Sequence, residues 1–161
     1  MKTLGNEIFR ECTGLEEIVI PEGVNLDSDT NFGLFHDCFG LKKAKLPDSW
    51  DAIPQYTFTN CHILESYHIN DNVRFIAGAA FAGCHGLTEI HLPEGVISIS
   101  SDAFKLCSSL KKIYLSPTEP PLLGEESFDL EIADRVFYVP QSSLEAYKEQ
   151  WSQYADQIVG L

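Results

Sequence analysis

The chain has 161 residues, enough for one domain, and 44% of them are hydrophobic, an ordinary fraction for a globular protein. Its formal net charge of −13 argues against nucleic acids and anionic lipid surfaces as partners, because both would repel it. No apolar run approaches the ~20 residues that a membrane-spanning helix needs, so membrane insertion is not expected.

One spaced pattern recurs along the chain: an aromatic residue, a cysteine three positions later, then leucine, isoleucine, leucine and proline. Its six copies begin at Phe9, Phe35, Phe58, Phe81, Phe104 and Phe128. The middle copies follow one another every 23 residues. A fixed period in the twenties is typical of a leucine-rich solenoid. We therefore expect a single domain over residues 1–161, with about five full repeats over 4–127 and a degenerate last repeat plus C-terminal cap over 128–161.

The N-terminal segment begins in the middle of a repeat. Leu4 falls in the slot that Ile76 and Ile99 hold in later copies, and no polar capping unit precedes it. The segment also lacks the apolar stretch of a signal peptide. Two hypotheses follow: the chain is a fragment of a longer protein, or its uncapped first repeat associates with another molecule, including a second copy of itself.

The first repeat is three residues longer than the middle ones, and the extra length contains Asp27, Asp29 and Asn31. This spacing is similar to a calcium-binding loop, but its glycine is Gly33, at the seventh position rather than the sixth. The twelfth position is Cys38, where such loops have a glutamate. An acidic surface loop is the simpler interpretation, and calcium binding is left open.

The fourth copy shows the elements that we expect in every repeat. Apolar and polar residues alternate from Ile90 to Leu92, which predicts a strand, and Pro93 ends it because proline has no N–H for the ladder. Val96 and Ile99 then direct a second short segment inward. A turn or short helical segment returns the chain to the next copy. Stacked repeats would place short parallel strands on one face and the turns or short helical segments on the other.

All five cysteines occupy the same repeat slot: Cys12, Cys38, Cys61, Cys84 and Cys107. A disulfide framework would show an even count at irregular spacings. Side chains on stacked strands ~4.8 Å apart also lie farther apart than the Cβ atoms of a disulfide. We therefore expect five reduced, unreactive thiols in the core.

The C-terminal region predicts a closed end. Residues 136–139 read as a last strand that stops at Pro140, and Ser142 followed by Glu145 is the pattern of a capping box. One helical face then carries large apolar residues that would cover the end of the stack. They are Leu144, Tyr147, Trp151 and Tyr154.

Alternation in the strands directs two ladders of side chains outward. One contains Glu17, Lys43, Ser66, Glu89 and Lys112, and the other contains Val19, Lys45, His68, His91, Tyr114 and Tyr138. Aromatic and cationic side chains are enriched where proteins bind partners. We therefore predict a partner-binding face formed by Lys43, Lys45, His68, His91, Lys112, Tyr114 and Tyr138. The alternative is a solvated sheet face with no partner.

Candidate catalytic and metal-binding sites are weak. His68 and His91 on neighbouring repeats lack a third ligand, and Lys45 beside them would repel a cation. Cys61 followed by His62 suggests a catalytic pair, yet adjacent residues on a turn point apart. Motifs for phosphate binding, serine hydrolysis and zinc hydrolysis are absent from the sequence. We expect no enzymatic activity, cofactor or metal.

The unbroken slots from Ala80 to Ile99 resemble the BspA-like leucine-rich repeats, and residues 138–147 with Trp151 resemble the C-terminal cap common in that family. The resemblance covers roughly residues 4–161. It implies a cell-surface or secreted protein of a host-associated microbe that engages host or neighbouring-cell proteins. The family shares no catalytic or metal-binding residues. The start of the chain departs from the family pattern, because it contains no signal peptide.

The function expected from the sequence is therefore a non-enzymatic protein-binding or adhesion module at the cell surface or secreted. Its partner would be a host matrix protein, a cell-surface protein or a surface glycan. Two alternatives stay open: a structural spacer, and an intracellular interaction module within a larger protein.

Overall fold

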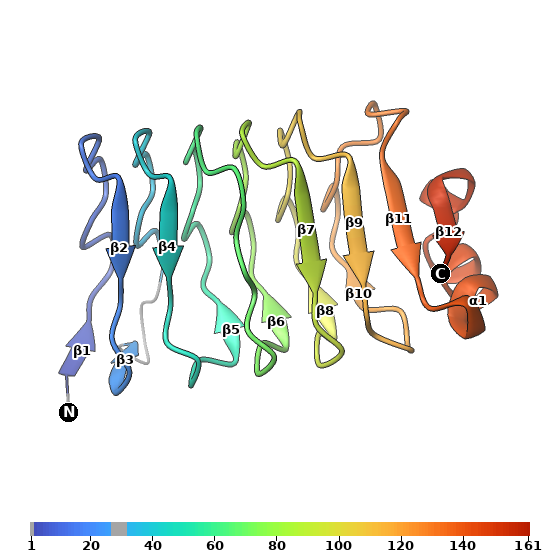
Figure 1. Ribbon diagram of the computed structural model, residues 1–161, viewed down its shortest axis with the longest axis horizontal. Helices are drawn as coiled ribbons and strands as arrows, with labels where there is room; N and C mark the ends of the chain where they lie inside the picture. The colour runs from blue at the N-terminus through green and yellow to red at the C-terminus, as the bar shows by residue number, and fades with distance from the viewer. Residues whose placement is uncertain (1, 27–31) are drawn as a thin grey trace.

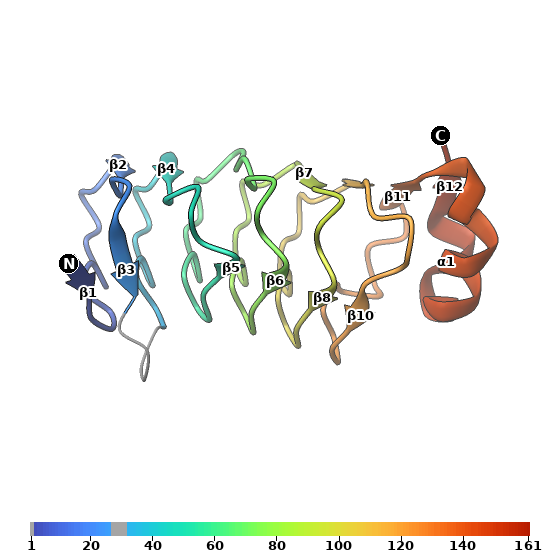
Figure 2. The ribbon, with the colours of Figure 1, turned by 90° about the horizontal axis from the view of Figure 1, so that it is seen from below.

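The protein, described by a computed structural model over residues 2–26 and 32–161, is a stack of coils that runs from the N-terminus at one end to a helical cap at the other (Figure 1). The coils carry two rows of short parallel strands on different sides of the stack (Figure 2). The architecture is a leucine-rich repeat solenoid. Within the described residues the repeats are linked by turns, and the helices all lie in the cap.

The front row of strands forms two parallel sheets. β2 (Glu17–Val19) pairs with β4 (Lys43–Lys45). The second sheet has the order β12-β11-β9-β7, with β7 (Glu89–Leu92), β9 (Lys112–Leu115), β11 (Val136–Val139) and β12 (Ile158–Gly160). Equivalent repeat positions are in register, so that His91 pairs with Tyr114 and Tyr114 with Tyr138.

The third coil interrupts the front row, because residues 65–70 form no strand. Tyr67 stands there where the other repeats have isoleucine, alanine or, in the sixth, phenylalanine. Its buried ring packs on Phe58 and Phe81 with centroid distances of 4.7 and 5.4 Å. Asn70 replaces the proline that follows most other front-row strand segments. The larger ring and the missing proline accompany a locally irregular backbone.

The back row also forms two parallel sheets. β1 (Lys2–Leu4) pairs with β3 (Val24–Leu26), and Leu4 lies opposite Leu26. The other sheet has the order β10-β8-β6-β5, with β5 (Ala52–Ile53), β6 (Phe75–Ile76), β8 (Ser98–Ile99) and β10 (Leu122–Leu123). Ile53, Ile76 and Ile99 are in register and almost fully buried. Leu4 therefore begins the stack in the repeat slot that the sequence predicted for it.

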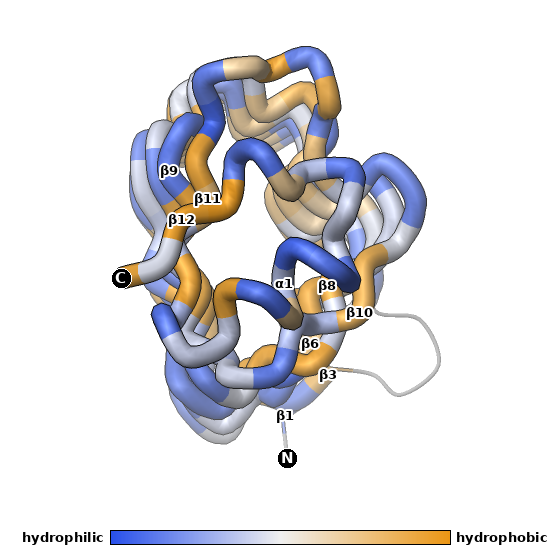
Figure 3. Tube along the Cα trace, turned by 90° about the vertical axis from the view of Figure 1, so that its right-hand side faces the viewer, coloured by the Kyte–Doolittle hydropathy of each residue, from blue (hydrophilic) through white to orange (hydrophobic). Residues whose placement is uncertain are grey.

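The buried hydrophobic side chains form one continuous cluster. Viewed along the stack, the coils lie behind one another (Figure 3). At the centre of the cluster the repeat phenylalanines stack on one another with ring centroids 5.0–5.6 Å apart. This column contains Phe9, Phe35, Phe58, Phe81, Phe104 and Phe128. Each ring in the middle packs on two neighbours, so the coils are stable only as a stack.

A column of buried thiols runs beside the rings. Each sulfur donates to the backbone carbonyl of the phenylalanine one coil earlier, at 3.0 Å for Cys38 to Phe9 and 3.1 Å for Cys84 to Phe58. Cys61 and Cys107 repeat this contact. All five cysteines are free of disulfides. The repeat thus uses cysteine because it is small and apolar and still supplies a donor to a buried carbonyl.

Cys12 differs from the other four, and the prediction of five core thiols is wrong at this position. It is exposed, because it lies in the first coil, against which only the second coil packs among the described residues. Burial raises the pKa of the Cys38 thiol to about 11, and burial also raises the pKa of Cys61 and Cys84. These three thiols are therefore poor nucleophiles at neutral pH.

The turn before each cysteine places one residue in the left-handed region of backbone conformation. Gly83 has φ of 73° there, while Leu106 has 59° and Asn60 has 59°. Leucine disfavours this conformation because its Cβ crowds the following carbonyl. Gly83 meets a second requirement, since a Cβ there would lie 2.4 Å from the Asn60 side-chain oxygen.

The cap covers the C-terminal end with a short 3₁₀ helix (η1, Gln141–Ser143), α1 (Leu144–Gln150) and a second 3₁₀ helix (η2, Ser152–Gln157). The indole of Trp151 donates to Pro121 O at 2.9 Å, and the hydroxyl of Tyr147 donates to Pro117 O at 2.8 Å. Tyr154 donates to Phe128 O at 2.6 Å. These residues therefore close the stack, as the sequence predicted. The prediction of a single helical face is wrong, because α1 ends at Gln150 and Tyr154 lies in η2.

Two details of the cap differ from the expectation. The prediction of a capping box at Ser142 and Glu145 is wrong. The N-cap of α1 is Ser143, which makes no side-chain capping hydrogen bond, because η1 occupies the residues before α1. The chain also ends in a strand that the sequence had not indicated, β12, which pairs in parallel with β11. No helix in the described residues has the length and apolar character to cross a membrane.

Arg135 is a buried cation beneath the cap, and no repeat slot predicts it. Its guanidinium donates to Leu110 O and Asp129 O, each at 2.9 Å, and lies 5.6 Å from the centroid of the Phe128 ring. Burial lowers the pKa of Arg135. The side chain supplies donors to backbone carbonyls of the fifth and sixth repeats.

Candidate recognition surface

The outward side chains of the front row form what we call the front face. They are Glu17, Val19, Lys43, Lys45, Ser66, His68, Glu89, His91, Lys112, Tyr114, Val136, Tyr138 and Val159. The face contains all seven residues that the sequence predicted for partner binding. The structure brings these residues together in two groups, one on β4 and one on β7, β9 and β11, with His68 between them on the third coil.

The N-terminal group is a set of exposed ion pairs. Lys43 Nζ lies 3.0 Å from Glu17 Oε1 across β2 and β4, and Lys45 Nζ lies 3.2 Å from Asp48 Oδ2. Beside them Lys42 pairs with Glu16 at 2.8 Å, which lowers the pKa of the Glu16 carboxyl. The charges of these lysines are therefore matched within the protein itself.

The C-terminal group is a stack of three rings, His91, Tyr114 and Tyr138, which we call the aromatic ladder. The ring centroids are 4.4 Å apart between His91 and Tyr114 and 4.8 Å apart between Tyr114 and Tyr138. The rings are within 14° of parallel. Val159 extends the row on β12, because it pairs with Tyr138.

The charges beside the aromatic ladder are less completely matched. Glu89 Oε1 lies 3.6 Å from His91 Nε2. Lys112 is exposed and forms no ion pair with any described residue, although Glu89 is its partner in register. The C-terminal half of the front face thus combines a free ammonium group with ordered aromatic rings.

The structure also places the residues of the weaker hypotheses. Cys61 Sγ faces the core and donates to Phe35 O, while the His62 ring packs at the surface between Phe39 and His85, at 4.8 and 5.0 Å. The thiol and the imidazole therefore point apart. Among the described residues no group of three or more His, Cys, Asp and Glu side chains could hold a metal ion. The calcium-loop residues Asp27, Asp29 and Asn31 lie outside the described residues.

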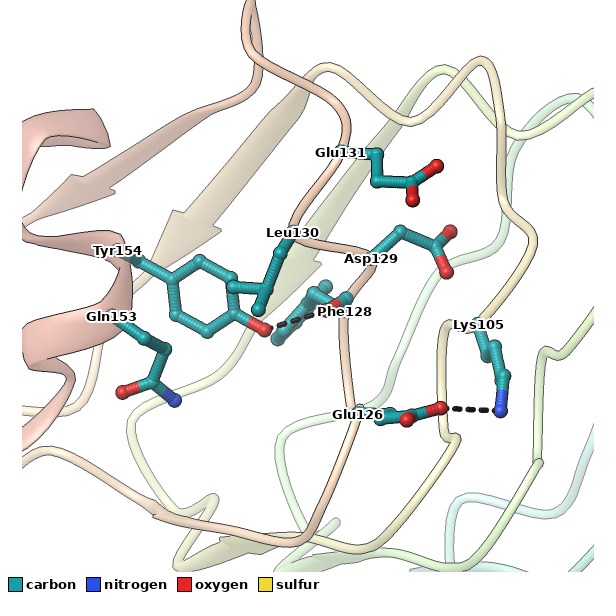
Figure 4. Close-up of a pocket in the computed structure, with 8 residues that line it drawn as sticks. All are labelled: Lys105, Glu126, Phe128, Asp129, Leu130, Glu131, Gln153 and Tyr154. Carbon is teal, nitrogen blue, oxygen red and sulfur yellow. Dashed lines mark hydrogen bonds and ion pairs between the residues drawn. The ribbon is translucent and has the colours of Figure 1, made fainter.

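A cleft of about 400 Å³ lies between the fifth and sixth coils and the cap (Figure 4). Its lining residues are Lys105, Glu126, Phe128, Asp129, Leu130, Glu131, Gln153 and Tyr154. Most of its polar groups bond within the protein: Glu126 pairs with Lys105, and Asp129 accepts from the Leu106 N–H. The cleft is therefore a weaker candidate for recognition than the front face.

A family model described as BspA type leucine rich repeat region (6 copies) matches residues 1–111 and, in a second register, residues 28–142. The two matches together span most of the chain. The protein belongs to the BspA-type leucine-rich repeat family. Proteins built from such repeats generally act as protein-interaction modules.

Solved structures of other bacterial repeat proteins are similar to this BspA-type domain. A leucine-rich cell surface protein from Faecalibacterium prausnitzii has 27% identity and a TM-score of 0.65, over 70% of this chain and 29% of that one. A leucine-rich repeat protein from Bacteroides ovatus has 23% identity and a TM-score of 0.65, over 89% and 44%. The leucine-rich repeat protein of T. pallidum has 21% identity and a TM-score of 0.64, over 86% and 62%.

The BspA-type chain thus spans less than two thirds of each of these proteins. The two structures under 25% identity support the shared fold alone. Comparison with curated protein sequences gives no match.

Proposed function

We propose that this protein is a non-enzymatic protein-binding module at a cell exterior, cell-surface or secreted, and that it binds its partner through the front face. The observation that carries the proposal is the ordered row of side chains along the parallel strands. Repeat register fixes His91, Tyr114 and Tyr138 in one line, so a partner meets a pre-arranged surface. Pre-arranged side chains lose little conformational entropy on binding.

The composition of the front face supports this role. Tyrosines are enriched at the energetically important centres of interfaces, since they bury a large area with few rotatable bonds. Tyr114 and Tyr138 are half-buried by their neighbours in the stack and so are already held in place. Among the similar structures, the F. prausnitzii protein is described as a cell surface protein, which supports the exterior location.

The cysteines and histidines support a non-enzymatic role. The only adjacent Cys–His pairs, Cys61–His62 and Cys84–His85, have sulfurs that donate to buried carbonyls. Burial raises the pKa of both thiols, so both are poor nucleophiles at neutral pH. Catalysis by such a pair would also require the thiol and the imidazole to lie within hydrogen-bond distance, whereas Cys61 Sγ faces the core and the His62 ring lies at the surface.

A binding assay with front-face variants tests the proposal. The protein would be used to identify a partner among host matrix and cell-surface proteins, and its affinity would be measured by biolayer interferometry. Changing Lys45, His91 and Tyr114 together to alanine is expected to lower affinity at least about tenfold, because hot-spot residues contribute 2 kcal/mol or more. A matched triple change on the back row, Arg74, Phe75 and Ser98 to alanine, is expected to leave affinity within about twofold.

The outcomes separate the proposal from the alternatives. Equal affinity of the front-face variant and the original protein would remove the front face as the recognition surface. If no partner binds under any condition while the protein separates flanking domains in a longer chain, the spacer function is correct. Detection of the folded protein only inside intact cells would contradict the proposed location at the cell exterior and favour an intracellular interaction module.

A further inference from the structure

The front face differs in charge from the rest of the molecule. It contains three lysines and two glutamates, so its formal charge is +1 with histidine neutral, whereas the whole chain carries −13. Carboxylates crowd the surface elsewhere, for example Glu125, Glu126 and Asp129 in the last repeat. A negatively charged partner is repelled least where it approaches the front face.

Within that face, the lysine that forms no ion pair among the described residues lies in the C-terminal half, which is formally neutral because Glu89 balances Lys112. Lys43 and Lys45 are already paired with carboxylates of the protein, at 3.0 and 3.2 Å. Lys112 is exposed, forms no ion pair among the described residues and lies on the same strand as Tyr114. A partner carboxylate could therefore bind Lys112 without displacing an existing partner, which makes this lysine the better anchor.

The aromatic ladder, like Lys112, presents positive electrostatic potential to solvent. Its rings stack face to face at 4.4 and 4.8 Å, so the inner ring faces are covered and the ring edges point to solvent. Aromatic edges are the positive part of the ring quadrupole, and the tyrosine hydroxyls add hydrogen-bond donors. Ring edges, hydroxyls and the Lys112 ammonium favour an anionic group above them, whereas Glu89, 3.6 Å from His91, opposes one at the His91 end of the ladder.

The covered ring faces also discriminate between classes of partner. Cations bind over ring faces, and sugars pack their C–H groups on them. Tyr114 has both faces occupied, by His91 and by Tyr138, so it offers neither kind of platform. These contacts favour a polypeptide with carboxylate side chains over a basic segment or a glycan.

We propose that the C-terminal half of the front face binds an acidic polypeptide segment, with a partner carboxylate on Lys112 and apolar or aromatic partner groups against Tyr114, Tyr138 and Val159. This proposal rests on the proposed function, because it names the chemistry of the partner for the same surface. The binding is expected to weaken with salt, since its charges are exposed.

Nuclear magnetic resonance titration with defined probes tests the proposal. The probe is a 12-residue peptide rich in Asp and Glu with one Phe; controls are its Asn/Gln analogue, a Lys/Arg analogue and polygalacturonate. The acidic peptide alone is expected to shift the backbone amides of Lys112, Tyr114 and Tyr138, and the fitted affinity is expected to fall at least about threefold between 50 and 300 mM salt. Equal shifts from the neutral or basic peptide, shifts from polygalacturonate alone, or shifts confined to other surfaces would overturn it.

Two variants distinguish a specific contact at Lys112 from a general effect of the protein's net charge on affinity. Lys112→Gln is expected to lower affinity for the acidic peptide about two- to fivefold, as expected for one exposed charge pair. Lys148→Gln removes the same charge from the cap helix and is expected to change affinity less than about 1.5-fold. Equal effects of both variants would show that only overall charge matters and would overturn the anchor.

The two proposals fail in different ways. A natural partner that needs Lys45, His91 and Tyr114 but is insensitive to Lys112→Gln and to salt would overturn the acidic-segment proposal and leave the proposed function standing. A natural partner that is insensitive to all four changes would overturn both.

Discussion

The two ends of the solenoid place the same repeat slots in different environments. At the N-terminal end Phe9 is only partly buried and Cys12 is exposed. At the C-terminal end Phe128 is fully buried, because Trp151 and Tyr154 of the cap pack against it. The difference teaches that burial in this fold depends on the neighbouring coil and not on the residue in the slot.

The largest expected effect is alkaline destabilisation through the buried thiols. The folded state raises the pKa of Cys38 to about 11 and that of Cys61 and Cys84 as well, whereas an unfolded thiol titrates near ~8.5. Above pH ~8.5 the unfolded state therefore loses protons first, so stability is complete below that pH and falls by about 1.4 kcal/mol per pH unit for each thiol.

Urea unfolding at pH 7, 9 and 10 measures this fall. Cys61→Ala removes one of the buried thiols and is expected to make this fall smaller, which makes it the matched variant. Equal stability at pH 7 and pH 10 would contradict the buried column of thiols.

The next largest effect is the difference in unfolding free energy between a variant in the cap and a variant in the first coil. Trp151→Ala is expected to lower the free energy of unfolding by about 3–5 kcal/mol, because it removes a buried ring and leaves Pro121 O without its indole donor. Phe9→Ala is expected to lower it by only about 1–2 kcal/mol, since Phe9 stacks on one ring, Phe35. Chemical denaturation of both variants gives the comparison, and similar values would show that the ends are equivalent.

A smaller difference in the free energy of unfolding is expected between variants of an interior cysteine and variants of Cys12. Cys84→Ala is expected to cost about 1–3 kcal/mol, because it opens a small cavity and removes the donor to Phe58 O. Cys12→Ala is expected to change stability by less than about 0.5 kcal/mol, as for other surface positions. Thermal and urea unfolding measure both. A large loss from Cys12→Ala would mean that another chain or segment covers the first coil.

The smallest effect concerns the left-handed turns. Leu106 has φ of 59° and an exposed side chain, so Leu106→Asn is expected to stabilise the protein by about 0.5–1 kcal/mol through relief of backbone strain. Asn60→Leu in the equivalent slot is expected to be destabilising, because it adds that strain and removes the bond to Asp37. A shift in the urea midpoint with an unchanged slope is the readout.

The repeat slots and the closing stripe could be predicted because their periods reflect burial. The spacing of Phe81, Cys84, Leu87 and Ile90 repeats, with single substitutions, in the first five coils, and each of these four side chains is buried in the structure. The apolar residues of the cap, which include Trp151 and Tyr154, could be predicted because their spacing also reflects burial. The outward ladders followed from strand alternation, which repeat register preserves.

Other features depended on partners that no local pattern specifies. The buried Arg135 contacts Leu110 O and the strand β12 pairs with β11, and both partners lie more than 20 residues away in the chain; the missing strand at Tyr67 accompanies ring contacts with Phe58 and Phe81. The order of the rings in the aromatic ladder depends on side-chain rotamers, which alternation does not determine. The sequence could therefore place His91 and Tyr114 in one row, but it could not show that their faces cover each other.

Thiol counting with an aromatic disulfide reagent tests most directly the claim that the coils share one interior. At pH 7.5 in the native state one thiol, Cys12, is expected to react rapidly, and all five are expected to react after denaturation. Rapid native reaction of two or more thiols would contradict the continuous buried column, and fewer than five after denaturation would reveal a disulfide.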